Sequence, residues 1–93
     1  MLVLLITLRL RAPWCQSLKD KRSETRRLLS AVKSKFNVSA VESGLQDVRT
    51  LIEISAAALA FNAAQADSMY ESICAFAQAS TQAELYACEK EIV

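Results

Sequence analysis

Residues 17–39 read S-L-K-D-K-R-S-E-T-R-R-L-L-S-A-V-K-S-K-F-N-V-S, and this stretch predicts a helix that leads directly into a strand. Ser17 is a typical N-cap residue, and Asp20 three positions later makes the start similar to a capping box. Asn37 is a reasonable left-handed C-cap, after which Val38–Ser43 reads as a short strand. At about 100° per residue, one arc of the helix carries the residues that would face a core: Leu18, Thr25, Leu28, Leu29, Val32 and Phe36.

The segment before this helix predicts a central strand. Within Met1–Arg11 the even positions Leu4, Ile6, Leu8 and Leu10 share one face, and the odd positions also begin apolar. Apolar residues on both faces are typical of a strand with neighbours on either side. Pro13 ends the strand because proline cannot donate to the ladder.

The segments after it predict two strands and a second helix. Gly44–Asp47 is a turn, and Arg49–Ala60 resumes strand character with Ile52, Ile54 and Ala56 inward. Asn62 with Gln65 opens the helix, and its core face would use Ala66, Met69, Tyr70, Ile73 and Phe76. Thr81–Cys88 closes the chain as a strand, with Leu85 and Ala87 inward and Glu84, Tyr86 and Cys88 outward.

The resulting order, β-α-β-β-α-β, is the ferredoxin-like split pattern. We therefore expect a single α+β domain over residues 1–93. Four antiparallel strands in the order 4-1-3-2 would form the sheet, with two helices on one face. At 53% apolar residues, the chain can form a core without metal or disulfide staples.

Charge is divided unevenly along the chain. Residues 1–36 hold nine Lys or Arg against two acids, a net charge of +7, and residues 37–93 hold two against eight, a net charge of −6. The net charge of the chain is only +1, but positive and negative residues are segregated along it. Such segregation attracts charged partners even when the net charge is near zero.

Three features of the sequence bear on the cellular compartment of the protein: the spacing of its cysteines, the lack of histidine and the short apolar segment at its start. Cys15, Cys74 and Cys88 are far apart with no C-x-x-C pair, and there is no histidine, so we expect reduced, buried thiols and no metal site. Met1–Leu8 is too short to span a bilayer and lacks a basic region or cleavage site. These features favour a cytoplasmic protein without a membrane partner.

S-L-K-D-K-R at 17–22, F-N-V-S at 36–39, Glu42 and the pair Gln46-Asp47 resemble the YlxP-like family of small bacterial proteins. The resemblance runs from Leu8 to about Asn62. It implies a compact ferredoxin-like domain encoded near translation-initiation and ribosome-maturation genes, with no established activity. Arg49 stands where the family usually has an aromatic residue, and Leu45 where it often has histidine.

One candidate site is a basic stripe on the first helix. Lys19, Arg22, Arg26 and Lys33 lie within about 60° of one another at helical spacing. Such a stripe can track RNA phosphates, and the alternative is a solvated face whose long stems cover the edge of the core.

A second candidate is the acidic loop with Glu42, Gln46 and Asp47. Two carboxylates and an amide could bind a cation or act in acid–base chemistry. The alternative is that these are ordinary turn residues.

The open face of the sheet is a third surface. Base stacking on a sheet requires exposed aromatics, and this face offers Tyr86 alone beside Leu5, Thr7 and Arg9. We expect it to suit a partner sheet, with Arg9 paired to Glu53 or Glu84.

No arrangement of residues predicts catalysis or a cofactor. The chain shows no nucleophile–base pair, metal cluster or glycine-rich cradle. We interpret Cys15 as a plain loop thiol and Trp14 as a lid on the core, the alternatives being a nucleophile and an exposed anchor. A pocket between Trp14, the first helix and the 44–50 loop could hold a small molecule.

The sequence therefore predicts an RNA- or ribosome-associated accessory protein that acts through its basic helix. The alternative function is a homodimeric or oligomeric interaction module without a nucleic-acid role, in which opposite charges meet across a two-fold axis.

Overall fold

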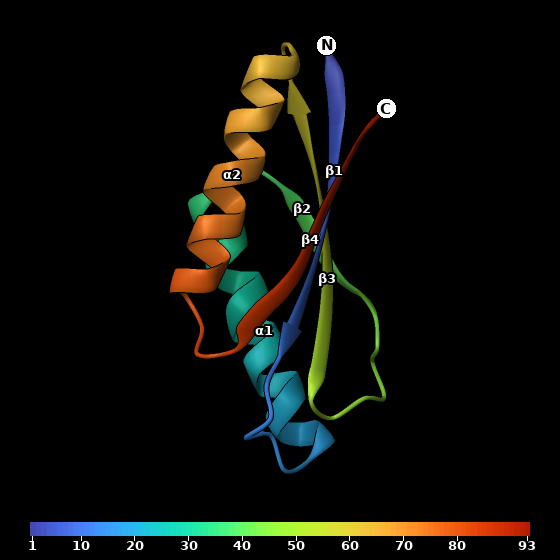
Figure 1. The fold of residues 1–93 in the computed structure, drawn as a ribbon, viewed down its shortest axis with the longest axis vertical. Helices are drawn as coiled ribbons and strands as arrows, with labels where there is room; N and C mark the ends of the chain where they lie inside the picture. The colour runs from blue at the N-terminus through green and yellow to red at the C-terminus, as the bar shows by residue number, and fades with distance from the viewer.

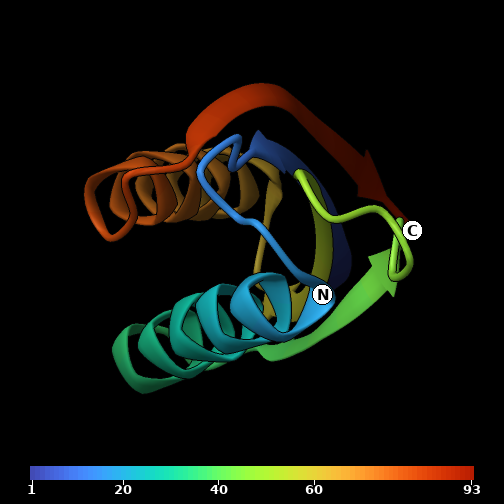
Figure 2. The same ribbon diagram turned by 90° about the horizontal axis from the view of Figure 1, so that it is seen from below.

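The computed structural model describes residues 1–93, and its elements follow the expected order. They are β1 (Leu2–Arg11), α1 (Leu18–Lys35), β2 (Ser39–Gly44), β3 (Leu51–Ala60), α2 (Ala63–Ala79) and β4 (Glu84–Ile92). All strand pairs are antiparallel, in the order β2-β3-β1-β4. Both helices pack on the same face of the sheet (Figure 1 and Figure 2). The predicted ferredoxin-like α+β fold and strand order are confirmed. Neither helix combines the length and the hydropathy needed to cross a membrane.

The core lies between the sheet and the helices. Leu4, Ile6, Leu8 and Leu10 of β1 are buried, as their alternation predicts. The alanine-rich end of β3 is a strand through Ala60, although alanine is a poor strand former. It is held because β3 is central: Ala56 pairs with Ile6 on one side and with Ala40 on the other.

Side-chain caps set the starts of both helices. Ser17 Oγ accepts a hydrogen bond from Asp20 N at 3.1 Å, and Asn62 Oδ1 accepts one from Gln65 N at 2.8 Å. The prediction for Asn37 was wrong, because Leu45 is the only residue other than glycine with positive φ. The helix ends one residue earlier, where extended Phe36 donates its N–H to Val32 O at 2.9 Å.

The last strand differs from its prediction in its bounds and in which of its side chains point to the core. β4 covers Glu84–Ile92 rather than Thr81–Cys88. The ladder pairs Arg9 with Ala87 but Leu10 with Leu85, so a bulge leaves one extra residue in β4. The β4 side chains that follow the bulge point to the opposite face of the sheet from the one predicted. Cys88 therefore packs against the core, and Ala87, opposite Arg9, lies on the open face.

The expectation of three reduced thiols was wrong for two of them. Cys74 of α2 and Cys88 of β4 form a disulfide across 14 residues of sequence. Only Cys15 is free, and it is buried. The pair was missed because C-x-x-C spacing was required, whereas two elements in contact can join distant cysteines. Because two of the three cysteines are joined, cysteine usage does not favour a cytoplasmic location.

Candidate functional site

The basic stripe is exposed along its whole length. Lys19, Arg22, Arg26 and Lys33 all lie on the solvent side of α1, while Leu28 and Val32 face the core. Lys19 and Lys33 are 14 residues apart, which is about 21 Å along the helix axis. At 3.4 Å per nucleotide of one strand, the stripe spans roughly six phosphates.

Ion pairing concentrates the free positive charge on α1. Five cations form ion pairs with carboxylates: Arg9, Arg11, Lys21, Arg27 and Lys90. Six are outside these ion pairs, namely the four stripe residues, Lys35 and Arg49. Five of these six belong to α1, so most of the positive charge that no carboxylate neutralises lies on this helix.

Lys21 has a role in the structure that was not predicted from the sequence. Its side chain is fully buried, its Nζ lies 3.0 Å from Glu42 Oε2, and it donates to the carbonyl of Leu45. The contact with Glu42 is an ion pair without a well-directed hydrogen bond, because that buried oxygen has no hydrogen-bond partner. Helical spacing carried the signal, since Lys21 falls on the same arc as Leu18, Thr25 and Leu28.

The side chains of the three residues in the predicted loop site do not converge on one point. The Glu42 carboxylate is directed to Lys21, and its backbone oxygen accepts a weak bond from Gln46 Nε2 at 3.5 Å. Gln46 and Asp47 are exposed on the loop, and no group of three His, Cys, Asp or Glu side chains is placed to hold a metal ion. Glu42 thus acts with Lys21 to fix the loop. A binding role for the loop stays a prediction.

Loop 45–50 has an unusual backbone at its start. Leu45 has φ of 57°, a left-handed conformation that costs a side-chain-bearing residue about 1–2 kcal/mol. Its carbonyl accepts from both Lys21 and Val48 N, so these two bonds hold the turn in place. A buried lysine therefore determines how the loop leaves β2.

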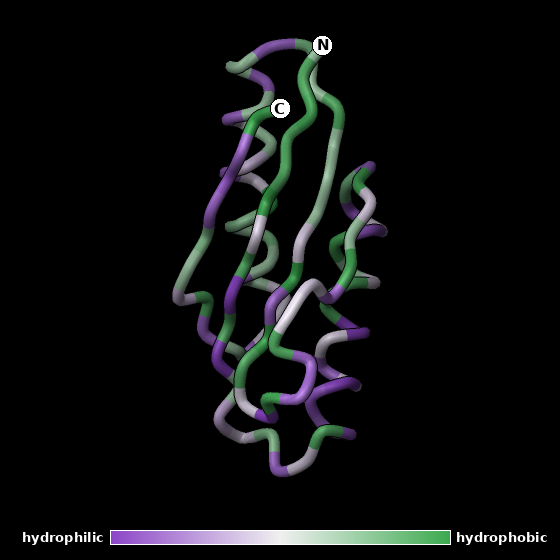
Figure 3. The backbone as a smooth tube through the Cα atoms, turned by 90° about the vertical axis from the view of Figure 1, so that its right-hand side faces the viewer, coloured by the Kyte–Doolittle hydropathy of each residue, from purple (hydrophilic) through white to green (hydrophobic).

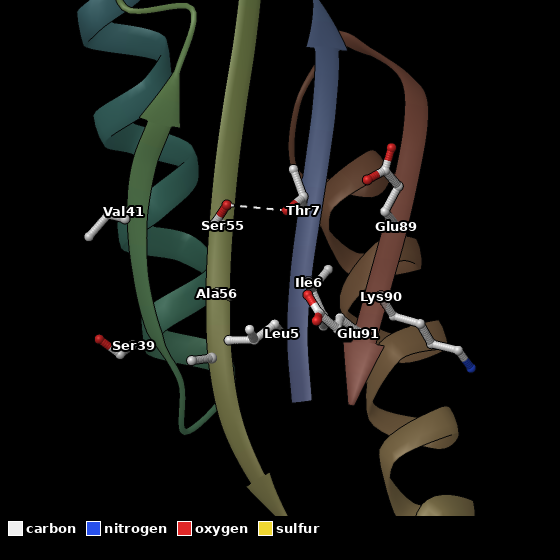
Figure 4. Close-up of a pocket in the computed structure, with 11 residues that line it drawn as sticks. Leu5, Ile6, Thr7, Ser39, Val41, Ser55, Ala56, Glu89, Lys90 and Glu91 are labelled. Atoms are coloured by element: carbon white, nitrogen blue, oxygen red, sulfur yellow. Dashed lines mark hydrogen bonds between the residues drawn. The ribbon is translucent and has the colours of Figure 1, made fainter. Parts of the chain in front are cut away.

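The open face of the sheet is hollowed over all four strands (Figure 4). The hollow encloses about 540 Å³, with Leu5, Val41 and Ala57 on its apolar side and Glu89 and Glu91 on its acidic side. The hydroxyls of Thr7 and Ser55 lie 3.3 Å apart across β1 and β3.

Toward the other end of this face, charges are paired within the sheet. Arg9 Nη1 donates to Glu89 at 2.8 Å and Arg9 Nε donates to Glu53 at 2.9 Å, and these bonds, first the one to Glu89, raise the pKa of the arginine. The predicted pairing of Arg9 with Glu53 is confirmed, while Glu84 instead accepts from Arg11 at 2.7 Å. The Arg11 guanidinium also lies 4.1 Å from the ring centroid of Tyr86, the single aromatic of this face.

The surroundings of Trp14 and Cys15 differ from expectation. Trp14 is 44% exposed, so it is not a lid on the core. The hollows beside it are lined by residues of α1 and of the α2–β4 loop, including Glu24, Arg27 and Thr81, rather than by the 44–50 loop. Cys15 is 1% exposed, and burial, followed by Asp20 and Glu24, raises the pKa of its thiol. This environment supports the plain-thiol interpretation, because a nucleophile requires the thiolate.

Comparison with protein families gives a match over nearly the whole chain. The family described as Protein of unknown function (DUF503) matches residues 3–90. The chain belongs to the DUF503 family. The match covers the stripe, Lys21, Glu42 and the 44–50 loop, and it extends into each of the six elements. No curated protein matches the chain.

Proposed function

We propose that this DUF503 protein is a non-enzymatic RNA- or ribosome-associated accessory factor. It contacts the phosphate backbone of structured RNA through Lys19, Arg22, Arg26 and Lys33 of α1. The observation that carries the proposal is the concentration of unpaired cations on this one helix. Free cations release counterions from nucleic acid on binding, whereas cations already held by carboxylates contribute less.

The chemistry of the stripe favours backbone contacts without sequence readout. Its four side chains form a line of point charges and guanidinium forks, with no aromatic residue among them to stack on bases. The resemblance to the YlxP-like family, with its neighbouring translation genes, favours RNA over DNA as the polyanion. A cytoplasmic location follows from that partner and is part of the proposal.

Salt dependence of binding tests the proposal. The parent should bind a structured RNA hairpin with an affinity that falls steeply as salt rises. Replacing Arg22 and Arg26 together by Ala should weaken binding and lower the slope of log affinity against log salt by about 1.4–1.8, since each phosphate contact contributes about 0.7–0.9. Fluorescence anisotropy between about 50 and 200 mM salt measures both quantities.

A double variant with the same loss of charge provides the control. Arg11→Ala with Lys90→Ala removes two cations that are already paired with Glu84 and Asp67. This control should retain most of the parent's affinity and its salt slope. Equal binding by the Arg22/Arg26 variant and the parent, or no binding by the parent at low salt, would exclude the proposal.

The open sheet face favours a second candidate function, a self-associating interaction module. Soluble monomers rarely expose a large contiguous apolar patch, and Leu5, Val41 and Leu59 on this face are 37%, 58% and 62% exposed. Sedimentation at tens of micromolar distinguishes a dimer from a monomer. The two candidates are compatible, because the stripe and the open face are different surfaces.

A further inference from the structure

The open sheet face carries a large share of the exposed apolar side chains. By strand register, Leu5, Val41 and Leu59 point to this face, and Val93 joins them because its backbone exchanges two hydrogen bonds with Val3. In Figure 3 the β1 and β3 segments at the end of the sheet that carries the termini are coloured mostly as hydrophobic. No helix covers this face, since α1 and α2 both pack on the other one (Figure 2).

We propose that the face is covered by a second copy of the chain, stacked face to face about a two-fold axis. The axis runs parallel to the strands and passes midway between β1 and β3. This inference rests on the second candidate function and adds the surface, the axis and the residue pairs to it.

The strand register supplies the argument for a second copy. β1 and β3 are the two central strands, and rotation about this axis places β1 of one copy over β3 of the other. Each residue then faces, in the partner copy, the residue that is its register partner within its own sheet. The register partners on this face are Leu5 with Ala57, Thr7 with Ser55 and Arg9 with Glu53.

These pairs are chemically complementary. Arg9 meets Glu53 of the other copy, and by symmetry Glu53 meets Arg9, so two opposite-charge contacts form across the interface. Both side chains retain exposure for such a contact, 30% for Arg9 and 18% for Glu53. The Thr7 and Ser55 hydroxyls face each other, and each Leu5 lies over an alanine. Stacked sheets rotate by about 30°, so the pairs nearest the centre fit best.

The remaining acidic residues avoid one another in this arrangement. Glu89 and Glu91 of β4 lie over β2 of the other copy, where the open face carries Ser39, Val41 and Ser43 but no acid. A two-fold axis perpendicular to the strands would instead place β4 over β4 and bring like charges together. Charge complementarity therefore selects the axis parallel to the strands.

The size of the face is sufficient for a stable dimer. The central strands β1 and β3 have 10 residues each, which is about 33 Å at 3.3 Å per residue. Four strands spaced by about 4.8 Å are about 19 Å wide, so the face covers about 600 Å². Specific interfaces bury about 600–1,000 Å² on each partner.

Charge exchange at one register pair tests the axis. Analytical ultracentrifugation of the parent should give a dimer at tens of micromolar. Arg9→Glu and Glu53→Arg should each weaken self-association by at least about tenfold, because each places like charges across the interface twice. Mixing the two variants should restore a 1:1 heterodimer, since each copy then faces its opposite charge.

Further variants separate folding from association. Leu5→Asn with Val41→Asn should also give a monomer without changing net charge, and circular dichroism should show that it remains folded. Arg26→Glu on α1 carries the same charge change as Arg9→Glu and should leave the dimer unaltered.

Each remaining outcome is decisive. A dimer that persists in Arg9→Glu, or a mixture that fails to pair, overturns the axis while leaving self-association intact. A monomeric parent at about 100 μM, far above the dissociation constants of standard stable interfaces, overturns the inference and the second candidate together. Neither result affects the RNA proposal, because that is measured on α1 by salt-dependent binding.

Discussion

Lys21 connects α1 to the end of β2 and to the loop that follows it. A fully buried ammonium requires a counter-ion and hydrogen-bond acceptors, and Glu42 and the Leu45 carbonyl provide them. The two members of the pair are not equivalent. Lys21 has no access to solvent, whereas the Glu42 side chain is 20% exposed.

This asymmetry predicts unequal costs for two substitutions. Glu42→Gln leaves the buried ammonium without a counter-ion and should lower the free energy of unfolding by about 3–5 kcal/mol. Lys21→Met leaves a carboxylate that can turn toward water, so we expect a smaller loss of about 1–3 kcal/mol. The double variant should lose less than the sum of the two. Urea unfolding measures all three values.

Lys19→Met is the matched control for Lys21→Met. It makes the same change on an exposed position of the same helix, where surface substitutions alter stability by no more than about 0.5 kcal/mol. Equal losses at positions 19 and 21 would contradict the role given to the buried pair.

At the residue scale, sequence patterns located exposed sites better than buried ones. The stripe residues follow from helical spacing alone, because an exposed side chain needs no partner to be placed. Lys21 lay on the predicted apolar arc and was overlooked because lysine rarely occupies a core position. Its partner Glu42 comes from another element, and that contact depends on the fold.

At the scale of elements, Glu24 connects α1 to the loop between α2 and β4. Its carboxylate accepts hydrogen bonds from Arg27 on the same helix and from Thr81, at 2.6 Å, in the loop. Arg27 also donates to the Ser80 carbonyl at 3.0 Å. Burial opposes the charged form of Glu24, but the bonds from Thr81 and Arg27 outweigh it and lower the pKa of Glu24.

The lowered pKa predicts how this connection depends on pH. A carboxyl group with a lower pKa in the folded state stabilises the protein above its unfolded pKa, about 4.3 for glutamate. That contribution is lost as pH falls through the folded pKa. Glu24→Gln should therefore be less stable than the parent by about 1 kcal/mol at pH 7. The difference should shrink as pH falls toward about 3.

Denaturant unfolding at several pH values checks the convergence of the two proteins. Glu71→Gln changes an exposed glutamate of α2 that is in no ion pair, and it should match the parent within about 0.5 kcal/mol throughout. A Glu24→Gln difference that is constant from pH 7 to about pH 3 would show that its charge is not involved.

At the scale of elements, the sequence predicted correctly the features that depend only on neighbouring residues. Ser17 and Asn62 were recognised as caps because a cap is made within four residues. The bulge in β4 depends on how that strand aligns with β1, whose paired residues there are 75 and 78 positions away in sequence. The faces to which Ala87 and Cys88 point were therefore predicted wrongly. The Cys74–Cys88 disulfide is a consequence of the same long-range alignment.

At the scale of the whole molecule, sequence charge and surface charge are different quantities. The fold pairs Arg9, Arg11 and Lys21 of the basic segment with acids of the later segment, which removes them from the free charge. The remaining free cations lie mainly on α1, on the helical side of the sheet. The two proposed functions therefore use opposite faces.

This separation predicts the stoichiometry of RNA binding. In a dimer joined through its open sheet faces, the two α1 helices lie on opposite outer surfaces, so each can bind one short RNA hairpin independently. We expect two hairpins for each dimer by native mass spectrometry. The Leu5→Asn/Val41→Asn variant should bind one hairpin for each monomer, with an affinity per chain within about twofold of the parent at equal salt, since its net charge is unchanged. One hairpin for each dimer would contradict independent binding by two outer α1 helices. A loss of affinity above about tenfold in this variant would place RNA on the sheet face instead of α1.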